Sequence, residues 1–235
     1  MSRTRVTATS WNMGNASEER VRADLVRLMY DADTLALQEA GDRGALLADY
    51  AKDRAIGLYR GDRSPGSASV PVLWRADAWG ALECWTVPLT KRSWAPQGVG
   101  PNWVKPKVVN LVRLRHRVTG EVLVAGSTHM PASLWAHLRA LVGLGLVRRL
   151  AKVVNDLPDH TVLIGGDWNT KVGSSILRPL HHRGRLRSAQ GRHPIATHGN
   201  RAIDDVWVRG IGGLLRSVKK TSSDHRAFKV TGTLR

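Results

Sequence analysis

The stretch that most constrains the fold of this chain is residues 161–169, Thr-Val-Leu-Ile-Gly-Gly-Asp-Trp-Asn. Its first four residues are rich in branched apolar side chains, which predicts a buried strand. The two glycines that follow allow the backbone to turn sharply and to end the strand. Asp167 and Asn169 come next, with a spacing that can place both side chains on one side of the turn, at the rim of a sheet. Such a pair can position a water and a phosphate oxygen, although ordinary polar turns use the same residues.

Other segments alternate between strand and helix patterns. Apolar runs predict strands over 6–12, 34–38, 70–74, 82–87, 108–116, 122–127, 202–209 and 227–234. Helical spacing predicts helices over 17–30, over 42–53, and after Pro131 to about Asn155. Hairpins mixed with strands that are separated by helices predict an α/β sandwich of mixed sheets, organised as a single domain over residues 1–235.

Two expectations concern the middle of the chain. The strands over 70–74 and 82–87 are predicted to be adjacent and joined by a polar turn at 75–77. Residues 88–106 combine Pro, Gly, Trp and basic residues without a regular pattern, which predicts one long exposed loop of a length that is more often functional than idle. Its Trp94 and Trp103 can stack on bases or wedge into a groove, but core packing explains such tryptophans equally well.

The formal net charge of +17 is unevenly distributed along the sequence. Residues 1–83 carry a net charge of −1 and residues 84–235 a net charge of +18. No acidic residue lies between Trp168 and Ile203, whereas seven basic residues do. This asymmetry favours a polyanionic partner, with nucleic acid first and an anionic membrane second. Drift toward arginine in a GC-rich genome is the alternative, but drift alone spreads charge evenly.

The remaining composition excludes several protein classes. A hydrophobic content of 42% with 10 prolines predicts a folded globule. We expect no secretion signal, because the N-terminus has no apolar segment of the required length, and no membrane span, because no apolar run reaches 18 residues. The single cysteine, Cys84, excludes an internal disulfide and a cysteine-based metal cluster. A reducing, cytoplasmic location without stable membrane association is expected.

Polar residues of a coherent set follow or adjoin the apolar runs. They are Asn12, Glu39, His129, Asp167, Asn169, Asp204 and His225. The ends of several strands can meet at one rim of a layered α/β protein, which is where a site is usually built. Carboxylate and amide oxygens suit Mg²⁺, and paired Asp and His side chains suit acid–base and orienting roles. The sequence contains no zinc-type histidine pair, P-loop or nucleophile-elbow motif.

Six short motifs resemble, in order, those of the endonuclease/exonuclease/phosphatase superfamily. They are Ser10-Trp-Asn-Met13, Leu37-Gln-Glu39, Ser127-Thr-His-Met130, Gly166-Asp-Trp-Asn169, Arg201-Ala-Ile-Asp204 and Ser223-Asp-His225. The resemblance spans residues 10–225. It implies a four-layer α/β-β/α sandwich of two mixed sheets flanked by helices. It also implies a single rim site that uses Mg²⁺ or Mn²⁺ to hydrolyse a phosphodiester.

The resemblance further implies a role for each matched residue. Glu39 is the implied main metal ligand, with Asn12 beside it and Asp224 near the metal. Asp167 orients or deprotonates the attacking water, and Asn169 holds the phosphate or water. Either Asp167 or the histidine of the last motif can be the base.

The implied histidine roles depend on neighbouring carboxylates. His225 contacts the scissile phosphate, and Asp204 fixes its tautomer and keeps it charged. His129 is the candidate acid for the leaving oxygen. In the deoxyribonuclease branch a glutamate supports this histidine, but residues 64–75 here contain no carboxylate. Asp205 is expected to be a surface charge.

The leading hypothesis from the sequence is a metal-dependent nuclease that acts on DNA and has no obligate protein partner. The residues expected to bind nucleic acid are Trp168, Lys171, Arg183, Arg185, Arg187 and Arg201. The alternative is a phosphatase or a phospholipase C-type hydrolase of the same fold, acting on inositol phosphates or sphingomyelin. A third class, a binding module without catalysis, is disfavoured because every matched catalytic position holds a competent residue.

Overall fold

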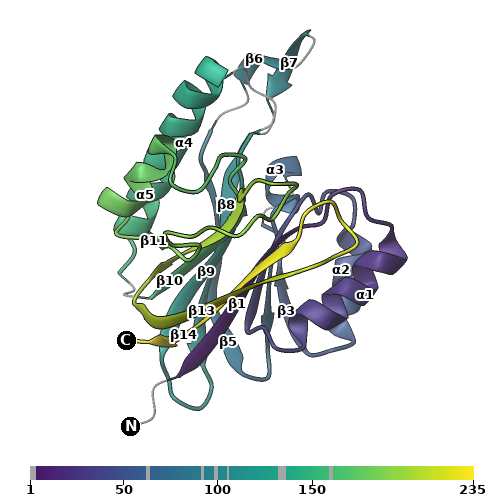
Figure 1. The fold of residues 1–235 in the computed structure, drawn as a ribbon. Helices are drawn as coiled ribbons and strands as arrows, with labels where there is room; N and C mark the ends of the chain where they lie inside the picture. Colours follow the sequence, from purple (N-terminus) through teal and green to yellow (C-terminus); the bar gives the residue numbers. More distant parts are fainter. Residues whose placement is uncertain are drawn as a thin grey trace.

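Two six-stranded sheets pack face to face and carry helices on their outer faces (Figure 1). The computed structural model describes residues 4–61, 64–90, 93–97, 100–104, 106–131, 136–158 and 161–235. Each sheet contains both parallel and antiparallel neighbours. The predicted α/β sandwich of two mixed sheets flanked by helices is therefore confirmed.

The first sheet has the order β13-β14-β1-β2-β4-β3. Its strands are β1 (Arg5–Asn12), β2 (Thr34–Gln38), β3 (Ile56–Tyr59), β4 (Val72–Arg75), β13 (Ile211–Lys219) and β14 (Ala227–Leu234). β1 runs parallel to β2 and antiparallel to β14. The two ends of the chain thus meet in the middle of this sheet.

The second sheet has the order β11-β12-β10-β9-β8-β5. Its strands are β5 (Trp79–Pro88), β8 (Val108–His116), β9 (Val122–His129), β10 (Val162–Asp167), β11 (Arg187–Ser188) and β12 (Asp204–Arg209). β9 and β10 are parallel, and β8 pairs with β9 as the predicted hairpin. Two further strands, β6 (Ser93–Gln97) and β7 (Gly100–Val104), form a separate small sheet.

Helices cover both outer faces. The helices in the described part of the chain are α1 (Glu18–Met29), α2 (Gly44–Lys52), α3 (Pro65–Ala68), α4 (Ala136–Asn155) and α5 (Arg178–His182), with a 3-10 turn η1 (Ser175–Leu177). α1 and α2 lie on the side of the first sheet, and α4 and α5 lie on the side of the second (Figure 1). Three apolar clusters fill the spaces between the sheets and beneath each helical layer. No helix among the described residues is long and apolar enough to cross a bilayer.

Two glycines lie inside β10 and do not end it, contrary to the expectation from the sequence. A Cβ atom at Gly165 would lie 2.5 Å from the Cβ of Ala36 in the opposite sheet. Glycine is therefore required here by the close approach of the two sheets. The strand continues to Asp167, which the prediction had placed in a turn.

Two other predictions for the middle of the chain are wrong. β4 and β5 are not neighbours, because β4 belongs to the first sheet and β5 to the second. β4 already pairs with β2 on one edge and β3 on the other, so the chain crosses to the opposite layer after Arg75. Residues 93–104 include a hairpin in place of the predicted continuous loop. The side chains of Trp94 and Trp103 lie outside the described residues.

Candidate active site

The polar residues that follow the strands meet at one rim of the sandwich. Asn12, His129 and Asp167 end β1, β9 and β10, and Asp204 begins β12. Asp167 is in register with both His129 and Asp204. This convergence is the arrangement that the sequence predicts.

Asp167 lies at the centre of the group. Only 1% of the residue is exposed, and its two carboxylate oxygens accept hydrogen bonds from Asn12 Nδ2 (3.0 Å) and from the Asn169 backbone N–H (2.9 Å). Burial, together with the nearby charge of Asp204, raises the pKa of Asp167 to about 7, although His225 opposes the shift. Asp167 is thus poised to exchange a proton near neutral pH.

Asp204 and His225 form a buried pair beside it. The Nδ1 atom of His225 lies 2.9 Å and 3.2 Å from the two carboxylate oxygens of Asp204, and its Nε2 lies 3.8 Å from Asp167. Burial alone would lower the pKa of His225, but the Asp204 hydrogen bond and the surrounding carboxylates outweigh it and raise this pKa to about 9. His225 is therefore an imidazolium at neutral pH.

Glu39 stands at the more open side of the site. It has a φ of 58°, and 44% of its side chain is exposed. Its Oε1 accepts a hydrogen bond from Asn12 Nδ2 (2.9 Å). The Oδ1 of Asn12 accepts the Gly14 backbone N–H (2.9 Å). Asn12 therefore orients the carboxylates of Glu39 and Asp167, and its place beside the metal stays a prediction.

Asp224 lies next to the site, on the side of His225. Its carboxylate groups with His198 and His225, whereas Glu39 groups with His129 and Asp167. A Cβ atom at Gly14 would lie 2.8 Å from Asp224 Oδ1, so the glycine, whose φ is +47°, lets the carboxylate approach the end of β1.

His129 is held by Asn169, whose Nδ2 lies 3.1 Å from the His129 Nε2 and donates to the Met130 carbonyl (2.9 Å). Burial, with further contributions from Lys107 and His225, lowers the pKa of His129 to about 3. The ring is neutral at physiological pH. A role as the acid for the leaving oxygen requires a protonated ring, which this environment disfavours, and that role stays a prediction.

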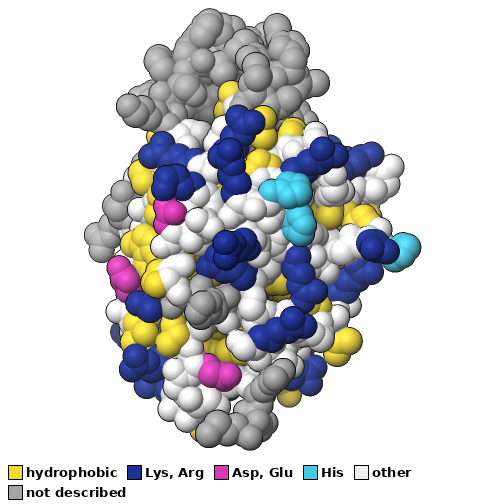
Figure 2. Space-filling view, turned by 90° about the vertical axis from the view of Figure 1, so that its left-hand side faces the viewer, with side chains coloured by type: hydrophobic (Ala, Val, Ile, Leu, Met, Phe, Trp, Pro, Cys, Tyr) yellow, Lys and Arg dark blue, Asp and Glu magenta, His cyan; other side chains and the backbone are white. Residues whose placement is uncertain are grey.

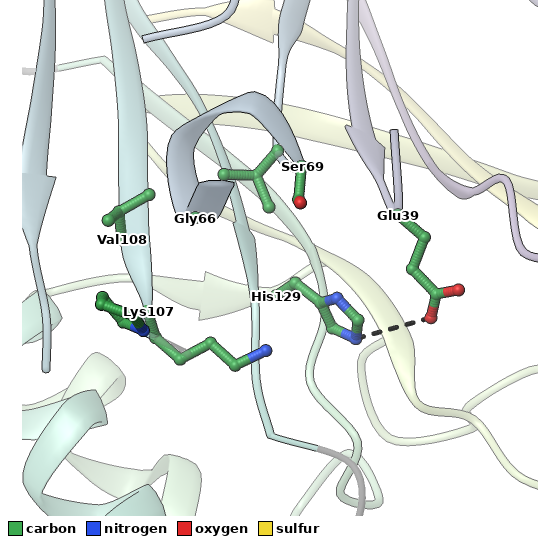
Figure 3. Close-up of a pocket in the computed structure, with 8 residues that line it drawn as sticks. Glu39, Gly66, Ser69, Lys107, Val108 and His129 are labelled. Atoms are coloured by element: carbon green, nitrogen blue, oxygen red, sulfur yellow. Dashed lines mark ion pairs between the residues drawn. The ribbon is translucent and has the colours of Figure 1, made fainter. Parts of the chain in front are cut away.

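A cavity of about 170 Å³ opens beside His129 and Glu39. Figure 3 shows the Lys107 side chain extending toward His129 across this cavity, with Ser69 on the opposite wall. The lining residues also include Gly66, Val70, Pro106 and Val108.

His198 belongs to the site and was missed in the sequence. Its ring centroid lies 4.4 Å from that of His225, and its Nε2 lies 3.2 Å from Asp224 Oδ2. Arg201 contacts its Nδ1 (3.1 Å). The surrounding segment follows no strand or helix pattern. Only the proximity of Thr197-His198 to the Arg201 motif could have identified it.

The expected nucleic-acid contacts divide into three groups. Trp168 is 1% exposed and packs in the core beneath α4 and α5, so the expectation that it contacts nucleic acid is wrong. Lys171 and Arg201 are exposed near the site. Arg183, Arg185 and Arg187 are exposed away from it, and Arg185 and Arg187 line a separate cavity.

Asp205 is buried, which corrects its assignment as a surface charge. Its carboxylate accepts hydrogen bonds from Ser188 Oγ (2.5 Å) and from the backbone N–H groups of Gln190 (3.1 Å) and Val206 (2.8 Å). The side chain fastens the segment before β12 to the strand. The sequence alone does not show which face of β12 is covered, so it does not reveal that this aspartate is buried.

A family comparison identifies the chain. A model described as the Endonuclease/Exonuclease/phosphatase family matches residues 9–225. The chain belongs to this family. The resemblance drawn from the six motifs is therefore confirmed. A search of curated proteins found no match.

Solved structures of low sequence identity share the fold over nearly their full length. An endonuclease/exonuclease/phosphatase family protein from Bacteroides thetaiotaomicron is 16% identical, with a TM-score of 0.78 and 100% of both chains covered. A mannosyl-6-phosphatase from the same organism is 17% identical, with a TM-score of 0.70 and coverage of 96% of this chain and 98% of that one. D. rerio TDP2, complexed with a single-strand DNA product, is 14% identical, with a TM-score of 0.72 and coverage of 98% and 99%.

Enzymes of the Endonuclease/Exonuclease/phosphatase family depend on divalent metal ions, and the side chains at this rim fit such an ion. Glu39, His129 and Asp167 each offer a ligand atom, and these atoms lie within 4.8 Å of one another. Carboxylate-rich sets of this kind suit hard divalent cations.

The first prediction from the site concerns stability. Burial raises the pKa of Asp205 to about 7, so its contribution to stability is fully present below the unfolded pKa near 4 and is lost as pH rises through 7. Asp205→Asn keeps the acceptor for the two backbone N–H groups and removes the charge. The free energy of unfolding of the variant, minus that of the wild type, should therefore rise by about 2–4 kcal/mol when the pH is raised from 5 to 9. Denaturant unfolding at both pH values measures this gap.

The control for Asp205→Asn is Asp156→Asn, which removes an exposed carboxylate paired with Lys152. Its stability difference from wild type should stay constant over the same pH range. An equal gap at both pH values for Asp205→Asn would contradict the assignment of a costly buried charge.

The second prediction concerns His198. Its ring packs on His225 and its Nε2–H fixes Asp224, so His198→Ala should lower kcat about tenfold or more, as loss of outer-shell partners of metal sites does. The pKa of His225, and with it the fall of activity at alkaline pH, should also move, because His198 holds Asp224, one of the carboxylates that raise this pKa. His193→Ala removes an exposed histidine elsewhere and serves as the control. A pH profile that is identical to wild type would contradict the positioning role.

Proposed function

We propose that this chain is a Mg²⁺- or Mn²⁺-dependent phosphodiester hydrolase that acts on DNA as a nuclease. The observation that carries the proposal is the position of Asp167. It lies between the Asp204–His225 pair and the open carboxylate of Glu39, at one rim of the sandwich. The proton acceptor Asp167, the imidazolium of His225 and the candidate metal ligand Glu39 thus surround one point.

The proton chemistry follows from the two pKa shifts. Asp167, with a pKa of about 7, accepts the proton of the attacking water at neutral pH. His225, with a pKa of about 9, keeps its proton and donates from Nε2 to a phosphoryl oxygen as negative charge develops there. These values favour Asp167 over His225 as the base.

The remaining polar residues orient these two groups. Asn169 donates its backbone N–H to Asp167, and its side chain holds His129. Asn12 directs Glu39 and Asp167 toward the same point. A divalent cation held by Glu39 would supply positive charge for the phosphoryl and leaving oxygens. Neutral His129 contributes a hydrogen-bonding ring and no proton.

The preference for a polyanion rests on charge. Lys107 reaches the cavity beside His129, and Lys171 and Arg201 are exposed on segments that flank the site. Figure 2 shows that on the face formed by the layer of α4 and α5, Lys and Arg side chains far outnumber acidic ones. Surfaces of this kind attract phosphate backbones through release of counterions.

The test of the proposed function is incubation of supercoiled plasmid with the protein and Mg²⁺, Mn²⁺ or chelator. Metal-dependent nicking or linearisation that chelator abolishes is the expected result. Activity should also fall steeply with added salt, because the phosphate contacts are electrostatic. Intact plasmid, abasic duplex and single-stranded DNA under both metals would overturn the proposal.

A phosphatase acting on a small phosphorylated substrate is the second candidate. The cavity of about 170 Å³ beside His129 favours it, because a compact polar group fits there against Lys107. The fold likeness to a mannosyl-6-phosphatase is consistent with this candidate. Release of phosphate from sugar or inositol phosphates, with plasmid left intact in the same buffer, would favour it over the nuclease.

A further inference from the structure

A second cavity, of about 420 Å³, lies in a part of the molecule that the proposed chemistry does not use. Its walls carry a histidine and four arginines, namely His181, Arg185, Arg187, Arg209 and Arg235. Buried apolar side chains form the rest of its lining, among them Leu186, Val208 and Ile211. The volume is within the range of small-ligand sites.

This cavity is separate from the candidate active site. β12 connects the two: Asp204, at its start, bonds His225, and Arg209, at its end, lines the second cavity. At the usual rise of a strand, five residue steps correspond to about 17 Å. Arg185 and Arg187 therefore cannot contact the scissile phosphate held beside Asp167 and His225.

The charge of the lining is of one sign. No Asp or Glu side chain lines this cavity in the part of the chain that the structure describes. Arg187 donates to the Ile211 carbonyl and Arg209 to the Gly184 carbonyl (3.4 Å), so backbone contacts anchor two of the guanidinium groups at the walls. Concave surfaces lined by one sign of charge concentrate ions of the opposite sign.

We propose that this cavity is a second, non-catalytic binding site for clustered phosphate groups. Planar guanidinium groups bind phosphate oxygens in pairs, and several of them around one hollow suit adjacent phosphates better than a single carboxylate. The apolar lining suits the base or sugar attached to those phosphates. The ligand is either a stretch of nucleic acid distant from the cleaved bond, which rests on the proposed function, or a free nucleoside polyphosphate, which does not.

The test begins with inorganic tripolyphosphate as the probe, titrated calorimetrically into the full chain in chelator. The double variant Arg185→Gln/Arg235→Gln removes two exposed arginines from the lining. The double variant Arg178→Gln/Arg183→Gln removes two exposed arginines that do not line the cavity and serves as the matched control. We expect the affinity for tripolyphosphate to fall at least tenfold in Arg185→Gln/Arg235→Gln and less than twofold in the control double variant.

Two results would overturn the proposal: no saturable binding of tripolyphosphate to the wild-type chain, or equal losses in the two pairs. Equal losses would mean that only net charge matters. Arg185→Gln alone repeats the comparison against Arg183→Gln if the double variant does not fold. Its expected loss is smaller but in the same direction.

Further arms identify the source of the phosphates and separate this proposal from the proposed function. Nucleic acid is supported as the ligand if Arg185→Gln/Arg235→Gln binds a labelled single-stranded DNA more weakly than wild type. The slope of log affinity against log salt concentration should then be lower by about 1 for each arginine lost. Weaker binding of ATP alone supports a nucleotide. Both double variants should hydrolyse bis(4-nitrophenyl) phosphate at the same rate. If the wild-type chain does not hydrolyse this substrate, the result counts against the proposed function and leaves the binding result intact.

Discussion

Replacement of Asp167 by asparagine is expected to lower kcat for phosphodiester hydrolysis by about 10³-fold or more, since the proton acceptor is lost. The same change should leave the protein folded. It removes a carboxylate that is 1% exposed and whose pKa burial has raised to about 7. Loss of that buried charge offsets the loss of one hydrogen bond from Asn12. The melting temperature should therefore change by only about 2–4 °C.

The measurement for Asp167→Asn is the initial rate on bis(4-nitrophenyl) phosphate and on plasmid, with Mg²⁺ or Mn²⁺. Asp156→Asn removes a charge of the same kind from an exposed position just after α4 and should retain the wild-type rate. The wild-type rate should rise as pH increases through about 7, because Asp167 must be ionised to accept a proton. A variant that keeps more than a tenth of the rate would contradict this role of Asp167.

The second large effect is expected at the Asp204–His225 pair. His225→Gln should lower kcat by about 10²–10⁴-fold, because glutamine cannot place a positive charge against the phosphoryl oxygen. In the wild type the imidazolium is present below pH 9 and is lost as pH rises through about 9. Activity should therefore fall on the alkaline side of that value.

Asp204→Asn provides the sharper test of the pair, because it leaves His225 in place. Burial disfavours the protonated ring, and only the carboxylates keep its pKa high. Asp204 is the nearest of these carboxylates, so its removal should shift the alkaline limb, the fall of activity at high pH, to lower pH by a unit or more. A simple structural defect would lower the rate at every pH without moving the limb. If the alkaline limb of Asp204→Asn lies at the same pH as in the wild type, its assignment to His225 is contradicted.

Much of this site could be predicted from the sequence because its residues follow strands directly. An apolar run identifies a strand, and parallel neighbours end at the same edge of a sheet, so Asn12, Glu39 and Asp167 were expected to converge. Asp204 and His225 were expected from their motifs. The structure brings these residues together within hydrogen-bonding chains that link Glu39, Asn12 and Asp167, and His225 and Asp204.

What could not be predicted depends on contacts distant in sequence. Gly165 resembles a strand breaker in isolation, but its role is to let two sheets approach at Ala36. Trp168 follows a catalytic-type aspartate in a basic half of the chain, yet its indole turns into the core beneath α4. β3, a short strand of four half-buried residues, pairs with the free edge of β4, so β5 cannot pair there and belongs to the other sheet.

The meeting of β1 and β14 has a consequence for biosynthesis. The two strands pair from Arg5 with Thr233 to Ser10 with Phe228, so the centre of the first sheet needs both ends of the chain. Asp224 and His225 lie just before β14, which begins at Ala227. A nascent chain on the ribosome therefore holds Asn12 and Glu39 long before their partners emerge from the exit tunnel, and truncated products released early carry no assembled centre.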